Sequence, residues 1–407
     1  MIVSVLQGNL KKALELAVQA VDKKPLLPAL GNIRLETGDC QLRVSSTDLE
    51  IGVDTWVGAK VYQDGWITLP AKELLAIVKS FPDARIDMRL DVPTLTVTLT
   101  VPPQDDDHDP ISAQLKGIDA AEYPVLRETP EKPFFTIYSK TLHDVLQRVL
   151  HSVAKEDNRP ILTGVDISAD AETQTVTFAA TDGYRLATEQ VSLHDPIIYP
   201  LHPDKNIPIN GMTVPAKALN ILMKRIAKDK EYDSIEVYYD PYKGSYGEVW
   251  FRDRYTDIFA ITLEGKYPDY NAIIPKSYGI SAVFDLTDMV SLLNRAKVYA
   301  KDNAESIKLV FQNDHMNGKD KIVVSAKSNE RGVFEQSIPA IIDGDSYDTN
   351  VNCKYLLEGL LGMEIKKDED AYKVRLESYG KDTLMVLTYA IHDSKYKCII
   401  MPMSTGR

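Results

Sequence analysis

The sequence predicts an α+β protein built from three tandem copies of one domain. A strand, a Pro-Ala-Lys step and a helix occur twice, as "ITLPAKELLAIVKSF" from residue 67 and "MTVPAKALNILMKRI" from residue 212. A fainter copy, "TNVNCKYLLEGLLGM", begins at residue 349. The shared lysines are 145 residues apart from Lys72 to Lys217 and 137 residues apart from Lys217 to Lys354. Such intervals are the length of a whole domain and not of a solenoid repeat.

Each Lys-bearing helix is preceded by a predicted hairpin and, further upstream, by a second helix. The hairpins are expected at residues 32–51, 164–186 and 306–332, where apolar and polar residues alternate around a turn. The upstream helices are expected at residues 10–21, 140–154 and 287–301, where apolar residues recur at i, i+3 and i+4. Each repeat therefore has the order helix, strands, helix, strands.

Two Tyr-Pro segments, "EYPVLRETPEKP" and "KYPDYNAIIPKS", have the composition of linkers between these domains. They place the predicted domains at residues 1–127, 128–275 and 276–407. A chain of 407 residues accommodates three domains of this size.

Composition is typical of a soluble globular protein, with 44% hydrophobic and 26% charged residues. Cys40, Cys353 and Cys398 are far apart in the sequence and form no CxxC spacing, which favours a reducing compartment and argues against a zinc site. The N-terminus has no signal-peptide pattern, and no apolar run approaches the length of a membrane span. We therefore expect a cytoplasmic protein.

The charge is distributed unevenly between the helices and the rest of the chain. The formal net charge is -12, which by itself disfavours binding to nucleic acid. The six predicted helical windows nevertheless contain thirteen basic and five acidic residues, a net charge of +8. Lysines are also common on solvated helix faces of proteins that bind no polyanion, so this alternative stays open.

No catalytic motif is present: the sequence lacks GxxxxGK[ST], HExxH, GxSxG and GxGxxG. The acidic segment "DDDHD" at residues 105–109 is the one candidate for a metal site, and its position between prolines is more typical of a solvated loop. We expect no catalytic residue, no metal and no cofactor.

Eight motifs distributed along the chain resemble the bacterial DNA polymerase III beta subunit, the sliding clamp family. They are "TDLEI", "LPAKEL" with "VPAKAL", "EYPVL" with "KYPDYNAIIPK", "RPILTGV", "ATDGYRLA" and the terminal "MPM". The resemblance implies a head-to-tail homodimeric ring of three clamp domains per chain, with helices around duplex DNA and antiparallel sheets outside. It implies a processivity factor that tethers a DNA polymerase and has no catalysis of its own.

The resemblance and the helical charge together give three sets of candidate residues. Binding to phosphates without base contacts would let the ring move along DNA. The expected DNA-facing residues are Lys12, Lys23, Lys24, Lys79, Arg148, Lys155, Arg159, Lys224, Arg225, Arg295, Lys297 and Lys301.

The resemblance implies a cleft for short linear motifs of polymerases, clamp loaders and repair proteins, of the type Gln-x-x-Leu-Phe. Its matching residues are Leu162, Thr181, Gly183, Tyr184, Arg185, Leu186, Pro268, Ile273, Ile399, Met401, Pro402 and Met403. Val298 and Tyr299 match the family's dimer interface.

Two other functions stay open at this point. One is a monomeric peptide-binding scaffold made of the same domains, and the other is a metal-dependent nuclease that uses residues 105–109. Without the family, "CIIMPM" and "ATDGYRLA" are equally well explained as buried strands. The chain also departs from the family at Tyr184, where histidine is common, and in the "STGR" that follows "MPM".

Overall fold

The structure is a computed structural model that describes residues 1–22, 24–25, 27–103, 109–124, 129–156, 158–198, 211–227, 234–243, 246–275, 277–314, 319–363, 373–380, 383–390 and 395–403. The chain forms two compact units. The first comprises Met1–Lys140, Asp195–Ile209 and Lys217–Thr262, and the second comprises Thr141–His194, Asn210–Ala216 and Leu263–Arg407. Each unit contains one antiparallel sheet, so the middle repeat contributes strands to both units.

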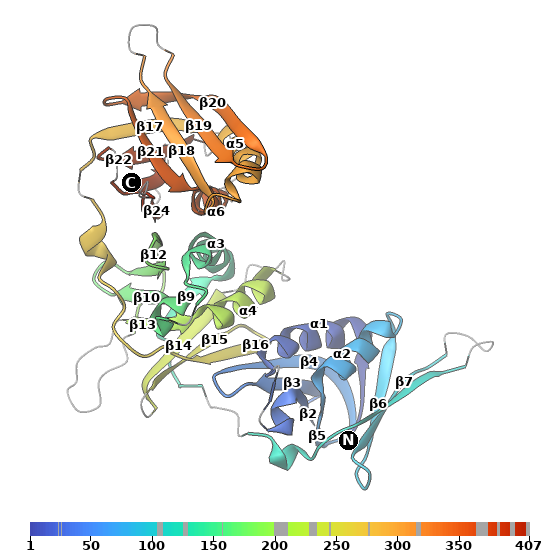
Figure 1. The fold of residues 1–407 in the computed structure, drawn as a ribbon. Coiled ribbons are helices and arrows are strands. Elements are labelled where there is room, and N and C mark those ends of the chain that lie inside the picture. The colour runs from blue at the N-terminus through green and yellow to red at the C-terminus, as the bar shows by residue number, and fades with distance from the viewer. Residues whose placement is uncertain are drawn as a thin grey trace. The chain divides into compact units, whose positions relative to one another are not determined.

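The sheet of the first unit follows the order β8-β7-β6-β1-β4-β16-β15-β14-β9, with β2, β3 and β5 joined to it through β4 (Figure 1). Its strands are β1 (Ile2–Leu6), β2 (Asn32–Gly38), β3 (Gln41–Thr47), β4 (Ile51–Gln63), β5 (Trp66–Pro70), β6 (Arg85–Asp91), β7 (Thr96–Val101), β8 (Ile111–Lys116), β9 (Phe135–Tyr138), β14 (Ser234–Lys243), β15 (Tyr246–Arg252) and β16 (Thr256–Ile261).

Two helices of the first unit, α1 (Gln7–Ala17) and α2 (Ala71–Ser80), pack against each other beside β3 and β4 (Figure 1). Their apolar faces complete a core with the strands, in which Leu14, Leu35, Val44, Leu74 and Met88 are fully buried. The helix α4 (Ala216–Ala227) belongs to the same unit from Lys217 onward. The exposed faces of these helices are left to polar and charged residues.

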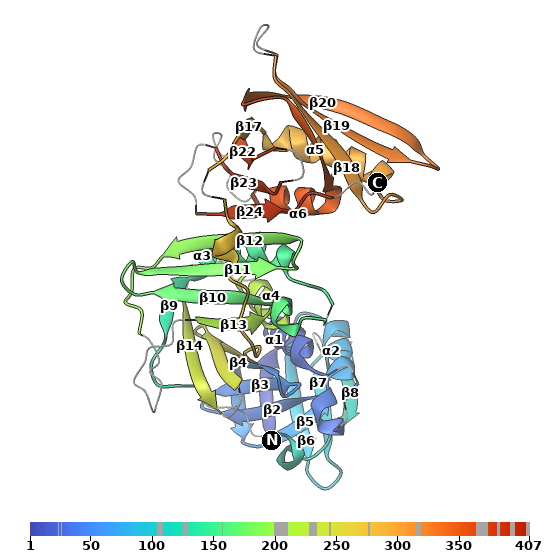
Figure 2. The same ribbon diagram turned by 60° about the vertical axis from the view of Figure 1, so that its left-hand side comes forward.

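The sheet of the second unit has the order β13-β10-β11-β12-β24-β23-β22-β17-β20-β19-β18-β21 (Figure 2). Its strands are β10 (Gly164–Asp170), β11 (Thr175–Thr181), β12 (Arg185–Ser192), β13 (Gly211–Pro215), β17 (Ile280–Asp285), β18 (Ser306–Gln312), β19 (Lys321–Ser328), β20 (Gly332–Asp343), β21 (Tyr347–Asn352), β22 (Lys373–Ser378), β23 (Met385–Tyr389) and β24 (Lys397–Ile400). Its helices are α3 (Ser139–Val149), which begins at the boundary between the units, α5 (Leu286–Ala300) and α6 (Cys353–Met363), and the last two pack together.

The predicted local elements are confirmed. The three hairpins form as β2–β3, β10–β11 and β18–β19, and the six helices form within a few residues of the predicted windows. In the first two repeats a proline precedes the Lys-bearing helix, whereas the third uses Asn352. Its side-chain oxygen accepts hydrogen bonds from the backbone N–H groups of Lys354 and Tyr355, at 2.9 and 3.1 Å. An N-cap thus stands in the third repeat where the first two repeats have a proline.

A Thr-Asp turn connects the second hairpin strand to the next strand in the first two repeats. The carboxylate of Asp48 accepts from the N–H groups of Glu50 and Ile51, and Asp182 accepts from those of Tyr184 and Arg185. These turns start β4 and β12, and each of these strands then pairs with the last strand of the following repeat, β16 and β24 respectively. In the described part of the chain, no helix combines the length and apolar composition that a membrane span requires.

Candidate functional site

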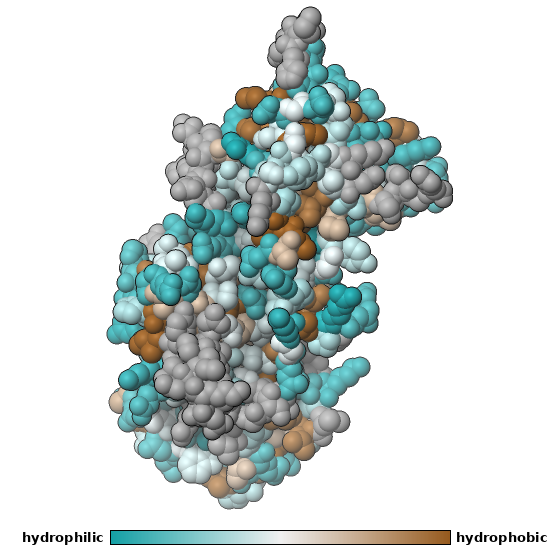
Figure 3. All heavy atoms as spheres, turned by 90° about the vertical axis from the view of Figure 1, so that its left-hand side faces the viewer, coloured by the Kyte–Doolittle hydropathy of each residue, from teal (hydrophilic) through white to brown (hydrophobic). Residues whose placement is uncertain are grey.

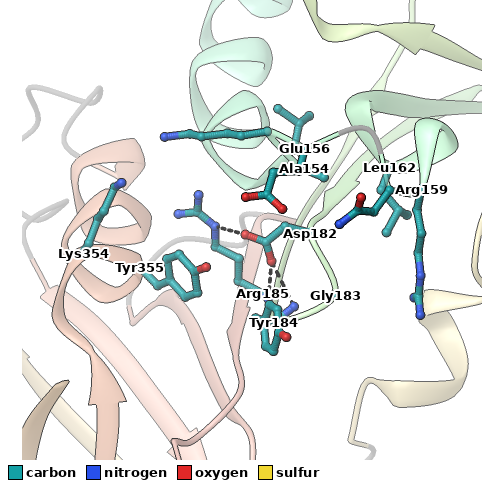
Figure 4. Close-up of a pocket in the computed structure, with 13 residues that line it drawn as sticks. Ala154, Glu156, Arg159, Leu162, Asp182, Gly183, Tyr184, Arg185, Lys354 and Tyr355 are labelled. Atoms are coloured by element: carbon teal, nitrogen blue, oxygen red, sulfur yellow. Dashed lines mark hydrogen bonds and ion pairs between the residues drawn. The ribbon is translucent and has the colours of Figure 1, made fainter. Parts of the chain in front are cut away.

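The second unit contains a pocket of about 610 Å³ around the turn that starts β12 (Figure 4). Its lining residues come from the segment between two 3-10 helices, η4 (Leu150–Ser152) and η5 (Pro160–Thr163), from the Thr-Asp turn, and from the first turn of α6. They are Val153, Ala154, Lys155, Glu156, Asn158, Arg159, Leu162, Asp182, Gly183, Tyr184, Arg185, Lys354 and Tyr355. The elements that form this pocket come from the second and third repeats.

Four predicted cleft residues, Leu162, Gly183, Tyr184 and Arg185, are brought together here. Gly183 has a φ of 90°, which a residue with a side chain adopts only with strain, so glycine suits this turn. The turn leaves the Tyr184 ring 67% exposed at the pocket. A large exposed aromatic ring beside a pocket is suited to apolar contact with a ligand.

Arg185 is held inside the protein by several contacts and is only 3% exposed. Its Nε donates to Asp182 at 3.0 Å, and its Nη1 forms an ion pair with Glu358 of α6. Its guanidinium carbon lies 4.3 Å from the centre of the Tyr355 ring, and the guanidinium points toward Asp182 in Figure 4. Arg185, one of the matched cleft residues, is thus buried with its Nε and Nη1 already engaged by carboxylates.

Three other predicted cleft residues, Thr181, Leu186 and Ile399, are buried. Leu186 and Ile399 are opposite each other in the β12–β24 pair and share a small core with Tyr270. They pack in the core next to the site and do not line the pocket. Nearby, burial followed by the positive charge of Arg185 lowers the pKa of His151 to about 4.

The C-terminal residues of the predicted cleft lie beside the Thr-Asp turn. The N–H of Met401 donates to the carbonyl of Tyr184 at 2.9 Å, and the Met401 side chain is 45% exposed. Pro402 and Met403 are half-buried. Pro268 and Ile273 are exposed but do not line this pocket. Residues 404–407, the "STGR" segment, lie outside the described residues.

Most of the predicted DNA-facing cations are exposed. They are Lys12 on α1, Lys24, Lys79 on α2, Lys224 on α4, and Arg295, Lys297 and Lys301 on or directly after α5. Some have neighbours: Lys79 forms an ion pair with Glu15 at 3.0 Å, and Lys224 donates to Gln19 at 2.8 Å. Lys155 and Arg159 are exposed too, but they line the pocket described above. Lys23 lies outside the described residues.

Two predicted DNA-facing arginines do not face solvent. Arg148 is 3% exposed and forms a buried ion pair with Glu189, so its assignment to a DNA-facing surface is wrong. The reason is helical phase, since Arg148 follows the buried Val145 by three residues and lies on the same side of α3. The Arg225 side chain is 16% exposed, pairs with Asp253 at 2.9 Å and donates to Thr256 at 3.1 Å, so it supports the fold instead.

The predicted dimer residues lie at the end of α5 beside β20. Val298 is 56% exposed, and its carbonyl accepts from Arg331 at 3.1 Å. The Tyr299 ring stacks on Phe334 of β20 with ring centres 5.7 Å apart. Both residues therefore adjoin the first half of β20. The face of the molecule drawn in Figure 3 is mostly hydrophilic, interrupted by apolar patches of limited size.

Comparison with known proteins gives consistent matches along the chain. Three family models match in order: the N-terminal domain of the DNA polymerase III beta subunit at residues 1–127, its central domain at residues 136–269 and its C-terminal domain at residues 271–404. The chain belongs to the DNA polymerase III beta subunit family. This confirms the resemblance that the sequence motifs indicated.

Individual relatives agree with this family. The beta sliding clamp of Synechococcus elongatus is 28% identical over 364 residues, which are 88% of each chain. The beta sliding clamp of Staphylococcus aureus is 25% identical over 398 residues, which are 95% of each chain. Among solved structures, the DNA polymerase beta subunit of Streptococcus pyogenes and the sliding clamp of Bacillus subtilis both give a TM-score of 0.84 over the whole of both chains, at 20% and 21% identity. These structures share the fold of three tandem clamp domains.

Sequence reasoning missed several pocket residues of this beta subunit family member. Val153, Ala154 and Glu156 belong to a charged segment after a helix, and nothing in their pattern distinguishes a pocket from a loop. Lys354 and Tyr355 carry a usable signal, because they follow the step that aligns with Pro-Ala-Lys and begin a helix. Of the acidic segment "DDDHD", residues 105–108 lie outside the described part of the chain. Among the described residues, no three potential ligands gather into a metal site.

Proposed function

We propose that this chain and a second copy form a closed ring around duplex DNA, which slides along it and tethers a DNA polymerase. As a member of the DNA polymerase III beta subunit family, the chain is a sliding clamp, a non-catalytic processivity factor. One edge of the first half of β20 has no partner strand among the described residues, and this free edge carries the proposal of a ring. We further propose a cytoplasmic location and domains at residues 1–127, 128–275 and 276–407.

Two junctions within the chain provide the pattern for ring closure. On the edge away from β3, β4 pairs with β1 through residues 59–63 and with β16 through residues 51–55. The strand β12 likewise pairs with β24. In each case the last strand of the next repeat extends the sheet. In the third repeat, β20 pairs with β17 only from Ala340 onward, and its first half has no described partner strand on that edge.

The strand β8 is the matching partner, because it is the last strand of the first repeat and an outer strand of its sheet. Equivalent backbone hydrogen bonds follow the last strand in every repeat. Ile118 donates to Thr68 at 3.0 Å, Leu263 to Thr213 at 2.8 Å and Met403 to Asn350 at 2.8 Å. Thr68, Thr213 and Asn350 occupy equivalent positions before the Lys-bearing helices. We infer that β8 of one copy pairs with β20 of the other.

The same equivalences give the register of this pairing. Val5 and Phe284 are equivalent, because each lies two residues before the helix that follows its strand, α1 and α5 respectively. Val5 is opposite Ala59 in the first repeat, and Phe284 is opposite Ala340 in the third, so Ala59 is equivalent to Ala340. Thr55 is therefore equivalent to Gln336, and Ile111 is equivalent to Thr256. Since Thr256 is opposite Thr55, Ile111 of one copy would face Gln336 of the other. Ala113 would face Phe334, beside Tyr299 and Val298, which were predicted at this interface.

Inside such a ring, the exposed cations Lys12, Lys24, Lys79, Lys224, Arg295, Lys297 and Lys301 would bind DNA phosphates. Phosphate contacts are independent of base sequence and weaken with salt, so they permit sliding. The net charge of -12 limits binding of DNA to the outside of the ring. The pocket of the second unit would bind linear motifs of the polymerase, the clamp loader and repair proteins.

Retention on circular DNA tests the ring. Loaded onto a nicked circle by its clamp loader, the protein should remain bound through a wash in 1 M salt, since salt screens phosphate contacts but does not open a ring. Cutting the circle once should release it. Equal loss from circular and linear DNA would contradict encirclement, and a monomeric mass in solution would favour the alternative of a monomeric scaffold.

A further inference from the structure

We propose that the pocket selects linear motifs in which carboxylates accompany the apolar residues, and that Lys155, Arg159 and Lys354 bind those carboxylates. The inference rests on the proposed function, since it takes this pocket as the place where partner segments bind. It adds a preference for acidic residues within those segments.

The charges that line the pocket do not balance. Arg185 forms an ion pair with Asp182 and a second ion pair with Glu358 of α6, so its charge is compensated within the protein. The remaining charged side chains are the three cations Lys155, Arg159 and Lys354 and the single acid Glu156, a local charge of +2 in a chain whose net charge is -12. Among the described residues, none of these three cations has an ion-pair partner. The pocket is thus a basic site on an acidic protein.

The three cations come from two separate elements and surround apolar surface. Lys155 and Arg159 belong to the segment between η4 and η5, whereas Lys354 lies in the first turn of α6. Figure 4 shows Arg159 near Leu162 and Lys354 near Tyr355, at different sides of the pocket. Apolar side chains of a bound segment would displace water from Tyr184 and Tyr355. Displacing water strengthens the attraction between the cations and carboxylates of that segment.

Arg185 does not take part in this selection. Arg185 is 3% exposed, its Nε and Nη1 are engaged by Asp182 and Glu358, and its guanidinium lies over Tyr355, so the protein's own groups hold it in place. It fixes α6 relative to the Thr-Asp turn and so positions Lys354 and Tyr355. The three cations around it, of which Lys155 and Arg159 are exposed and Lys354 is half-buried, are left to bind the ligand.

The concave shape favours a peptide over duplex DNA as the occupant. A pocket of about 610 Å³ has the size that accommodates a few side chains, and a duplex presents a convex surface. Lys155 and Arg159 were predicted to face DNA, but they adjoin Leu162 within this pocket. The lining combines two tyrosines with six charged side chains, a mixture suited to a peptide that presents both apolar and charged groups.

Fluorescence anisotropy with two labelled peptides tests the proposal. One peptide, Gln-Asp-Asp-Leu-Phe-Glu, carries three carboxylates, and its twin, Gln-Asn-Asn-Leu-Phe-Gln, replaces them with amides of the same shape. The acidic peptide should bind about tenfold more tightly at low salt, as expected for a few partly exposed charge pairs. Raising the salt to 0.5 M should reduce this preference to less than about threefold.

Variants assign the preference to the named cations. The double variant Lys155→Met, Lys354→Met should lose most of the preference and bind the amide peptide as the parent does, whereas the control Lys321→Met should retain it. Equal binding of both peptides to the parent would overturn the inference but leave the peptide site intact. Binding of neither peptide would overturn the peptide site itself. Single-stranded DNA is the alternative ligand. If it competes with the amide peptide, binds the double variant more weakly than the parent, and peptide charge has no effect on peptide affinity, then the cations bind nucleic acid and the inference is wrong.

Discussion

Arg148 and Arg185 illustrate how this chain uses buried arginines as internal connections. Arg148 of α3 pairs with Glu189 of β12, and Arg185 at the start of the same strand pairs with Glu358 of α6. Removing one member of a buried pair leaves an uncompensated charge and typically costs several kcal/mol. Substituting either arginine is therefore a poor test of binding, because a loss of affinity would follow from a distorted site.

His151 gives a pH-dependent prediction at the scale of one residue. Its ring interacts with Ser152 at 3.0 Å and Tyr396 at 3.5 Å, and burial followed by the charge of Arg185 lowers its pKa to about 4. An unfolded histidine has a pKa of about 6.5, so the unfolded state binds more protons below that pH. Stability from this residue is present above about pH 6.5 and is lost as the pH falls toward 4, by roughly 2 kcal/mol at pH 5.

Urea unfolding at pH 7.5 and pH 5 measures this effect. The parent should lose more stability between the two pH values than the His151→Gln variant, which keeps a hydrogen-bonding side chain but does not titrate. Both proteins must be compared at one concentration, since oligomers are stabilised by association. Identical losses in parent and variant would contradict the depressed pKa of His151.

At the scale of elements, α4 carries an exposed cation, Lys224, next to a cation that supports the fold, Arg225. Lys224 is exposed, whereas Arg225 is engaged with Asp253 and Thr256. We predict that Lys224→Glu slows loading onto nicked circular DNA several-fold with little change in melting temperature. Arg225→Glu would place a carboxylate against Asp253 and should cost roughly 2 to 4 kcal/mol of stability. If the two variants have the same stability, Arg225 is not the structural residue of this pair.

The elements themselves were predictable from the sequence because their signals are local. The stripe of Leu142, Val145 and Leu146 marks α3, and the alternation in residues 164–181 marks β10 and β11. The pocket was less predictable, since it forms only when residues 153–162 meet the turn at Asp182 and a helix that begins at Cys353. The family motifs located Leu162 and Tyr184 there. They could not indicate that Arg185 would be buried or that Lys354 would line the pocket.

At the scale of the whole molecule, the triplication explains both the recurring Lys-bearing helix and the recurring junction. One strand arrangement is used at β4–β16 and again at β12–β24, and it leaves β20 and β8 with complementary edges. Exposed strand edges favour pairing with another chain unless they are blocked. Two copies of this chain would remove both edges at once, since each copy offers one β8 and one β20, and head-to-tail pairing of two copies closes a ring.

Disulfide cross-linking tests the register of that closure. In a Cys40→Ser background, which removes the exposed cysteine, Ile111→Cys with Gln336→Cys should give a covalent dimer under mild oxidation. The equivalent pair within the chain, Thr55 and Thr256, has hydroxyl oxygens 3.2 Å apart. The control Ala113→Cys with Gln336→Cys shifts one position by two residues, to a diagonal distance of about 7 Å that a disulfide spans poorly. Efficient cross-linking of the control would show that β8 and β20 do not meet in this register. The same conclusion would follow if neither variant cross-linked in a solution where the measured mass is that of a dimer.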